Sequence, residues 1–185
     1  AHLGLGNALH HKNELDRAIA SFREAARLKP DHAMAHFNLA NALRDAGKMD
    51  LAIASCNEAI RLEPDYAEAH LGLGLALVSQ GHFQEALKSL RKGHEIGSKR
   101  PDWPYPTMEF IASVEQQAEL EDRLNRVLSG EREPRDAVER IAFARMLCAK
   151  SRHADSARMY AEAFAGDPSL AEAEGNRYNA ACSAS

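Results

Sequence analysis

The chain matches itself at a shift of 34 residues, and this periodicity limits its fold more than any other feature of the sequence. Residues 1–6 recur unchanged as residues 69–74, and residues 35–40 lie midway between them. Extending the alignment gives columns of one residue type, such as Leu5, Leu39 and Leu73, then Leu9, Leu43 and Leu77, and later Ala18, Ala52 and Ala86. Such a period predicts stacked supersecondary units, because one unit alone cannot bury its apolar face.

Each unit has the features of a helical hairpin. The turn column holds Asn13, Gly47 and Gly81, residues that tolerate the left-handed backbone conformation at the end of a helix. Pro30 and Pro64 then stop the second helix of the first two units. Small residues in the other columns let two helix backbones approach closely. We therefore expect an all-α fold, a right-handed α-α superhelix of stacked antiparallel helical hairpins.

The period and its columns together resemble the tetratricopeptide repeat, with three repeats over residues 1–98. The resemblance implies a solenoid whose concave surface is lined by the first helix of each hairpin. It also implies a non-catalytic scaffold that binds a protein or peptide there.

The regular pattern breaks at residues 99–134. Three prolines within residues 101–106 predict an extended segment, after which Thr107 is a suitable N-cap for a long helix over residues 108–128. Trp103 and Tyr105 lie in the extended segment. We expect them to fold back over an exposed apolar edge; the alternative is a polyproline ligand for another protein.

Residues 135–185 form the last part of the chain. Setting Pro168 at the closing position places Phe143 and Leu147 on a first helix and Tyr160 on a second, which predicts a degenerate fourth hairpin. Residues 170–182 would then begin a further, truncated unit.

Residues 93–182 also resemble the C-terminal halves of large bacterial repeat proteins, through phrases such as those at residues 93–98, 161–164 and 177–182. Many of those proteins carry a serine/threonine kinase domain ahead of the repeats. The resemblance implies a recruitment or regulatory arm of a kinase, although residues 1–185 contain no kinase motif. The abrupt first and last residues suggest a piece of a longer protein.

Composition excludes several classes of partner. The net charge of −4 offers no basic excess for a nucleic acid, and no apolar run approaches the roughly 20 residues that span a bilayer. Three widely spaced cysteines, Cys56, Cys148 and Cys182, indicate reduced thiols and a cytoplasmic location.

We expect no catalytic residue, metal or cofactor. His2, His36 and His70 lie one repeat apart, and hairpins that stack roughly 8–10 Å apart cannot bring three ligands to one ion. A packing role is expected for them. The pairs Gly4/Gly6 and Gly72/Gly74 lack the third glycine of a nucleotide-binding loop.

Helical spacing instead predicts a peptide-binding groove. Its candidate residues are Leu3, Asn7 and His10 from the first repeat, Phe37, Asn38, Asn41 and Arg44 from the second, and Leu71 and Leu75 from the third. Asparagine side chains both donate and accept hydrogen bonds, so they can hold a peptide backbone while the apolar residues contact its side chains. The alternative is that they only solvate an exposed face.

Two families related by the repeat limit the choice of partner. Asn7 and Asn38 are similar by spacing to the two asparagines of chaperone-binding tetratricopeptide domains, but Leu3, Glu68 and Gly72 stand where those domains have basic residues. A clamp for a C-terminal carboxylate is therefore not expected. Residues 37–43 resemble the asparagine-bearing repeats of O-linked N-acetylglucosamine transferase, although only the second repeat keeps the full pattern. A different hypothesis is self-assembly into a homo-oligomer through the open ends of the solenoid.

Overall fold

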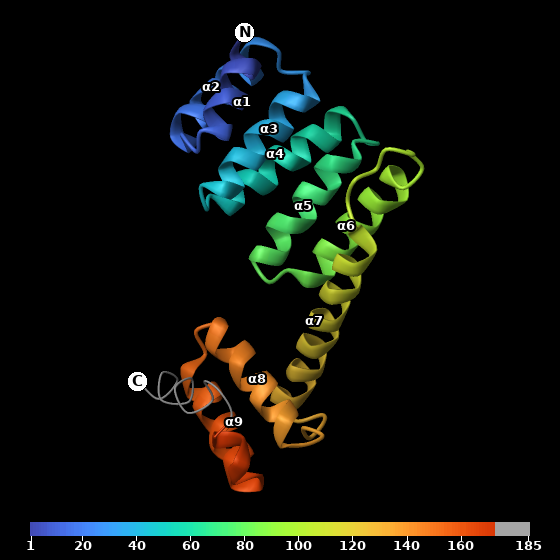
Figure 1. Ribbon diagram of the computed structural model, residues 1–185. Helices are drawn as coiled ribbons and strands as arrows, with labels where there is room; N and C mark the ends of the chain where they lie inside the picture. Colours follow the sequence, from blue (N-terminus) through green and yellow to red (C-terminus); the bar gives the residue numbers. More distant parts are fainter. Residues whose placement is uncertain (173–185) are drawn as a thin grey trace. The chain divides into compact units, whose positions relative to one another are not determined.

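The computed structural model describes residues 1–172, and over this range every regular element is a helix (Figure 1). The all-α solenoid expected from the columns is confirmed. Six helices form the first part of the chain: α1 (His2–His11), α2 (Leu15–Leu28), α3 (Ala33–Asp45), α4 (Met49–Leu62), α5 (Ala67–Ser79) and α6 (Phe83–Gly97). The others are α7 (Thr107–Leu128), α8 (Ala137–Ala149), α9 (His153–Gly166) and the short 3-10 helix η1 (Pro168–Ala171).

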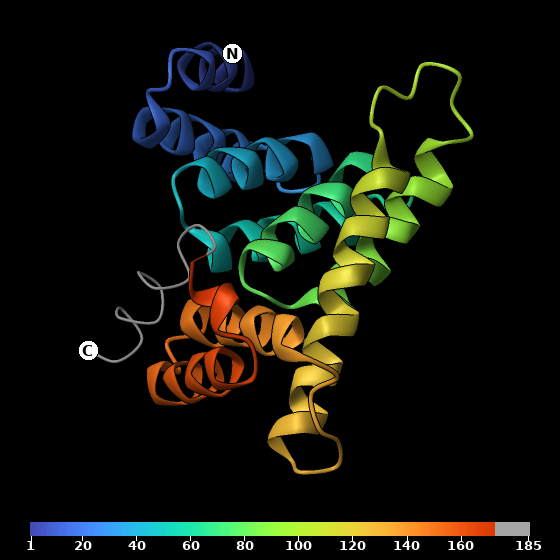
Figure 2. The same cartoon turned by 60° about the horizontal axis from the view of Figure 1, so that its bottom comes forward.

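The chain divides into two compact units, residues 1–116 and residues 117–185, with the boundary inside α7. The first unit contains three antiparallel hairpins, α1/α2, α3/α4 and α5/α6, which follow one another along a stack (Figures 1 and 2). The first half of α7 belongs to this unit and buries Ile111 and Val114. The second unit contains the rest of α7 and the hairpin α8/α9.

The same turn closes all four hairpins. Its residue with positive φ is Asn13 (59°), Gly47 (72°), Gly81 (77°) or Ser151 (57°). In each turn the next amide donates back to a leucine carbonyl of the first helix, as from Glu14 to Leu9 at 2.9 Å and from Arg152 to Leu147 at 2.9 Å. This pairing satisfies carbonyls that the helix end would otherwise leave without a partner. The left-handed turn predicted for the first three repeats therefore occurs in the fourth as well.

Small residues set the distance between the two helices of a hairpin. A Cβ added at Gly6 would lie 2.5 Å from the Phe22 ring, and one added at Gly74 would lie 2.5 Å from Cγ of Leu90. The alanine column at Ala18, Ala52 and Ala86 is buried. Because the small column leaves room, one large residue per hairpin fills the space, and Phe22 and Leu90 are each 1% exposed.

The histidine column links neighbouring hairpins. Nε2 of His36 lies 3.0 Å from the carbonyl oxygen of Pro30, and Nε2 of His70 lies 2.9 Å from that of Pro64. Each ring therefore bonds to a carbonyl group in the loop that joins its own hairpin to the preceding one. This arrangement agrees with the packing role expected for these residues.

The fourth hairpin has its own core and a partly buried ion pair. Phe143, Leu147 and Tyr160 are each at most 1% exposed, and Leu124 of α7 lies in the same cluster. Glu139 of α8 is paired with Arg123 of α7 and also accepts a hydrogen bond from the Arg135 amide at 2.6 Å. The prediction of a further helix over residues 170–182 falls mostly outside the described residues; within them, residues 168–171 form η1.

The proline-rich segment turns back onto the first unit. The ring of Trp103 lies over Gly97, where an added Cβ would be 2.5 Å from the indole, and its centroid is 4.9 Å from that of Tyr105. Arg100 stacks over the Trp103 ring at 5.4 Å. The two aromatic residues therefore cover an apolar edge of the hairpin stack, as the sequence predicted. Among the described helices, none is long and apolar enough to cross a membrane.

Candidate functional site

The first helices of the three hairpins, α1, α3 and α5, line a shared cavity of about 280 Å³. We call it the polar cavity. Its lining residues are His10, Phe37, Asn41, Arg44, Glu68, Leu71, Gly72, Leu75 and Tyr105. Six of them, His10, Phe37, Asn41, Arg44, Leu71 and Leu75, are candidate groove residues from the sequence.

The other three candidates lie elsewhere. Asn7 and Asn38 do not line the polar cavity but bond to each other, with Nδ2 of Asn38 donating to Oδ1 of Asn7 at 3.2 Å. Leu3 packs against the core between the first two hairpins and lines a separate cavity with Leu28 and His32. Of the apolar candidates Leu3, Phe37 and Leu71, which occupy equivalent positions in the three repeats, only Phe37 and Leu71 line the polar cavity.

A chain of polar contacts crosses one side of the polar cavity. Nε2 of His10 lies 2.8 Å from Asp45, and the Arg44 guanidinium contacts the same carboxylate at 3.2 Å. Arg44 also donates to Oδ1 of Asn41 at 3.2 Å. Since the Asn41 oxygen is occupied, its amide hydrogens are the part of the side chain that can donate to a bound backbone.

Phe37 and Gly72 lie side by side in the lining of the cavity, and Tyr66 packs on Phe37 from outside the lining. The rings of Phe37 and Tyr66 have centroids 5.1 Å apart. A Cβ added at Gly72 would lie 3.3 Å from Sγ of Cys56 and 3.4 Å from the Phe37 ring, so a larger residue here would crowd both. Burial raises the pKa of the Cys56 thiol to about 12, and burial is also the main cause that raises the pKa of Tyr66 to about 12. Both groups are therefore neutral at physiological pH.

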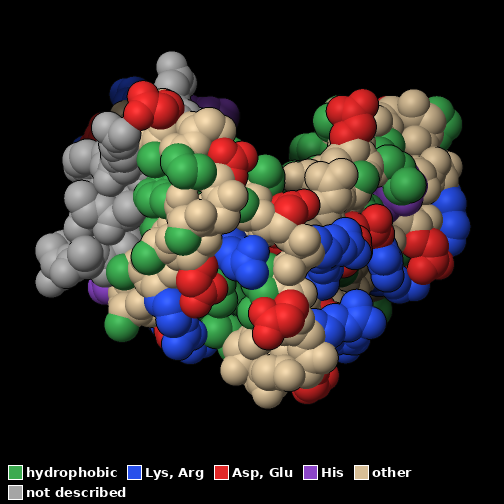
Figure 3. Space-filling view, turned by 90° about the horizontal axis from the view of Figure 1, so that it is seen from below, with side chains coloured by type: hydrophobic (Ala, Val, Ile, Leu, Met, Phe, Trp, Pro, Cys, Tyr) green, Lys and Arg blue, Asp and Glu red, His purple; other side chains and the backbone are tan. Residues whose placement is uncertain are grey.

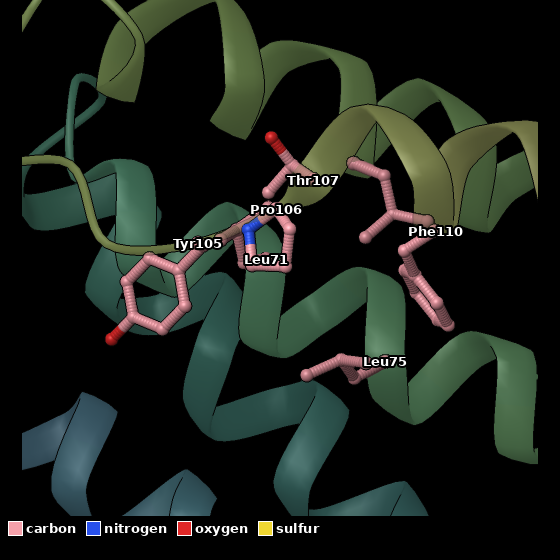
Figure 4. Close-up of a pocket in the computed structure, with 7 residues that line it drawn as sticks. Leu71, Leu75, Tyr105, Pro106, Thr107 and Phe110 are labelled. Atoms are coloured by element: carbon pink, nitrogen blue, oxygen red, sulfur yellow. The ribbon is translucent and has the colours of Figure 1, made fainter.

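An apolar pocket of about 160 Å³ adjoins the polar cavity and shares Leu71, Leu75 and Tyr105 with it. We call it the apolar pocket; its remaining lining residues are Leu90, Pro106, Thr107 and Phe110. The rings of Tyr105 and Phe110 lie on opposite sides of the leucines (Figure 4). The Thr107 hydroxyl is hydrogen-bonded to Nδ1 of His94, so it is already satisfied.

The sequence did not predict that Tyr105 would line this site. It reaches the cavities because the proline-rich segment returns along α5 and α6, where Arg100 pairs with Glu68 at 2.7 Å. Pro106 next to Tyr105 and Phe110 at the start of α7 enter the site for the same reason. A segment with three closely spaced prolines has no helical period, so nothing in the sequence showed which surface the segment would reach.

Over the described residues, no group of three or more histidine, cysteine, aspartate or glutamate side chains is arranged to hold a metal ion. Positive and negative side chains are interspersed on the face shown in Figure 3. The arrangement at the cavities offers amide donors, apolar side chains and internally paired charges. These groups are suited to holding a polypeptide segment.

Comparison with known proteins identifies the repeats. A family model described as "TPR repeat", for the tetratricopeptide repeat, matches residues 6–43 and 40–81. No curated protein matches the sequence.

Solved structures show the same fold. The first tetratricopeptide domain of Spaghetti (RPAP3), bound to the HSP90 peptide SRMEEVD, is 20% identical with a TM-score of 0.60, over 64% of this chain and 90% of that one. The TPR2B domain of yeast Sti1, in complex with pHsp70, is 22% identical with a TM-score of 0.56, over 63% of this chain and 91% of that one. The type III secretion translocator chaperone SycD of Yersinia enterocolitica is 16% identical with a TM-score of 0.61, over 64% of this chain and 83% of that one.

The matched segments run from within α1 to just after α5, and each contains members of the turn and small-residue columns. Residues 6–81 therefore form tetratricopeptide repeats, the family whose model they match.

Proposed function

We propose that the chain is a non-catalytic interaction scaffold that binds a peptide segment of a partner protein along α1, α3 and α5. The observation that carries this proposal is the polar cavity, which gathers Phe37, Asn41 and Arg44 from one hairpin with Leu71 and Leu75 from the next. Two of the similar structures were solved with HSP90 or Hsp70 ligands, which is consistent with a binding role for this fold.

The chemistry of the site supports a peptide more than a small charged ligand. Asn41 presents its amide hydrogens in the polar cavity, with apolar surface from Phe37 and Leu71 beside it. Asn38 lies one helical turn before Asn41 on α3, outside the cavity lining, where it is bonded to Asn7. An extended or helical segment could place its backbone against the amides and its side chains against the apolar residues. Leu3, Glu68 and Gly72 still stand at the positions where a carboxylate clamp would need basic residues.

The test is selection of peptides from a random display library on the whole chain, followed by titration of the selected peptides. The double variant Asn38→Ala/Asn41→Ala should weaken their binding by up to about thirtyfold, because two lost amide contacts of on the order of 1 kcal/mol each add to about 2 kcal/mol. Asn57→Ala is the matched control, since Asn57 is an exposed asparagine on the second helix α4. Equal affinity for the double variant and the control would remove these asparagines from the binding site.

Self-assembly is a second candidate function. Leu5 of α1 is 51% exposed and Leu28 of α2 is 54% exposed, so the first hairpin presents large apolar side chains. Sedimentation over a hundredfold range of concentration tests this, with a monomer at every concentration as the contrary result. A role as a kinase arm stays a prediction, and the coding sequence upstream of Ala1 would decide it.

A further inference from the structure

The groove changes character from one hairpin to the next. Equivalent positions hold Asn7, Asn41 and Leu75 in one column and His10, Arg44 and Val78 in another. The first two hairpins therefore contribute amides and ionisable groups, whereas the third contributes aliphatic side chains. A ligand that lies along all three meets a polar stretch followed by an apolar one.

The apolar stretch ends in a pocket with a defined size. The apolar pocket holds about 160 Å³, and Leu75 (37% exposed) and Tyr105 (46% exposed) leave it open to solvent. An apolar cavity of roughly 150 Å³ is large enough for a benzene molecule. A single leucine, methionine or phenylalanine side chain is therefore the group that this volume accommodates.

The wall of this pocket is formed before any ligand arrives. Tyr105 is held against Trp103, and Trp103 in turn lies over Gly97 and under the Arg100 guanidinium. A preformed pocket loses little conformational entropy when it is filled, so one side chain inserted here can anchor a longer segment.

The charges near the pocket are already compensated within the protein. Glu68 is 19% exposed and pairs with Arg100, and the Arg44 guanidinium pairs with Asp45, which also contacts His10. An incoming carboxylate would have to displace Asp45 from Arg44 and would lie near Glu68. An incoming lysine would compete with Arg100. An uncharged ligand disturbs neither pair, so charge complementarity favours it.

We propose that the partner of this scaffold is an uncharged peptide segment that inserts one leucine-, methionine- or phenylalanine-sized side chain between Tyr105 and Phe110. This inference rests on the proposed function and names the chemistry of its ligand. The side chain fills the apolar pocket beside Leu71 and Leu75, and the neighbouring peptide group accepts a hydrogen bond from the Asn41 amide.

The first experiment uses three small probes on the whole chain with 13C-labelled leucine methyl groups. These are the N-methylamides of N-acetyl-leucine, N-acetyl-phenylalanine and N-acetyl-aspartate. The first two should shift the methyl resonances of Leu71, Leu75 and Leu90 in a saturable manner, with dissociation constants in roughly the millimolar range expected of ligands this small. The aspartate probe should leave them unchanged. Equal shifts with all three probes, or none with the first two, would overturn the proposal.

The second experiment uses variants. Leu75→Asp should weaken binding of the leucine probe at least tenfold, while Leu51→Asp should not change it, since Leu51 is a 47% exposed leucine on α4 outside the pocket. Thermal unfolding of both variants shows whether the fold is kept. Phe110→Ala changes the pocket without adding a charge, because it removes one wall. It should also weaken binding of the phenylalanine probe.

The peptides selected by display separate this inference from the proposed function. Selected peptides that share one large apolar residue, lack charge and lose affinity with Leu75→Asp support it. Selected peptides that depend on Asn38 and Asn41 but are acidic like SRMEEVD, and bind Leu75→Asp normally, overturn the inference and leave the scaffold function standing. If the library yields no binder while the leucine probe still occupies the pocket, the scaffold function fails instead.

Discussion

Gly6 of α1 faces Phe22 of α2 so closely that a Cβ on residue 6 would lie 2.5 Å from Cε1 of the ring. Two residues earlier on the same helix, a Cβ on Gly4 would meet no atom within 4 Å. The two glycines look alike in the sequence, where both belong to the segment that recurs at residues 69–74. Only Gly6 is required by the contact between the helices.

This difference gives a prediction with an internal control. Gly6→Ala should lower the free energy of unfolding by about 1–3 kcal/mol, because Phe22 is 1% exposed and cannot move aside without disturbing the core. Gly4→Ala should raise it by up to about 1 kcal/mol, because alanine is the better helix former. Urea denaturation of both variants measures the two changes. Equal effects of the same sign would mean that the helix spacing does not depend on Gly6.

The turns supply a second prediction. Ser151 has a φ of 57° in the turn position that Gly47 occupies in the second repeat with a φ of 72°. Ser151→Gly should stabilise the hairpin α8/α9 by about 0.5–1 kcal/mol, since glycine adopts this conformation without steric cost. Gly47→Ala should destabilise its own hairpin by about 1–2 kcal/mol for the same reason. Amide hydrogen exchange resolves the two hairpins separately, and faster exchange in α8 of Ser151→Gly or slower exchange in α3 of Gly47→Ala would contradict the assignment.

The ion pair between Arg123 and Glu139 supplies a third prediction. Their side chains are 19% and 8% exposed, so Arg123→Ala should leave a poorly hydrated carboxylate and cost about 3–5 kcal/mol in the second unit. Arg126→Ala is the control from the same helix, because Arg126 pairs with Asp122 at a site where the side chains are 46% and 55% exposed. That loss should stay below about 1 kcal/mol. Urea unfolding followed by exchange of the α8 amides compares the two, and similar losses would argue against the buried pair.

The buried thiol of Cys56 supplies a fourth prediction. Because burial raises its pKa to about 12, it should react with iodoacetamide in the native protein at least tenfold more slowly than the partly exposed Cys148. The unfolded chain releases this proton near pH 9 but the folded chain keeps it to about pH 12, so the free energy of unfolding should fall as the pH rises between those values. Peptide mass spectrometry after timed labelling measures both rates. Labelling of Cys56 as fast as Cys148 at pH 8 would show that the thiol is accessible.

Those parts of the structure that depend on local periodicity could be predicted from the sequence. The columns at Asn13, Gly47 and Gly81 indicated the turns, and aligning Pro168 with Pro30 placed Phe143 and Tyr160 in the core of a fourth hairpin. These features follow from spacing within one unit, since helix geometry relates residues that are close in sequence.

Contacts between neighbouring hairpins could not be derived in this way. The pairing of Asn7 with Asn38 depends on how adjacent hairpins rotate against each other, and a helical wheel does not contain that angle. Leu3 shares its column with Phe37 and Leu71, but it lies in a different cavity, beside Leu28 and His32. The place of Tyr105 depends on a segment that has no period at all.

The origin of Tyr105 and Pro106 outside the repeats determines how this groove could be re-engineered. A 34-residue unit inserted between Pro30 and Asp31 would extend the polar stretch and leave the aromatic wall in place. A unit inserted after Gly97 would separate that wall from Leu71 and Leu75 and abolish the pocket. The groove can thus be lengthened at its N-terminal side without loss of the pocket that holds the anchor side chain of the ligand, whereas an insertion after Gly97 removes that pocket.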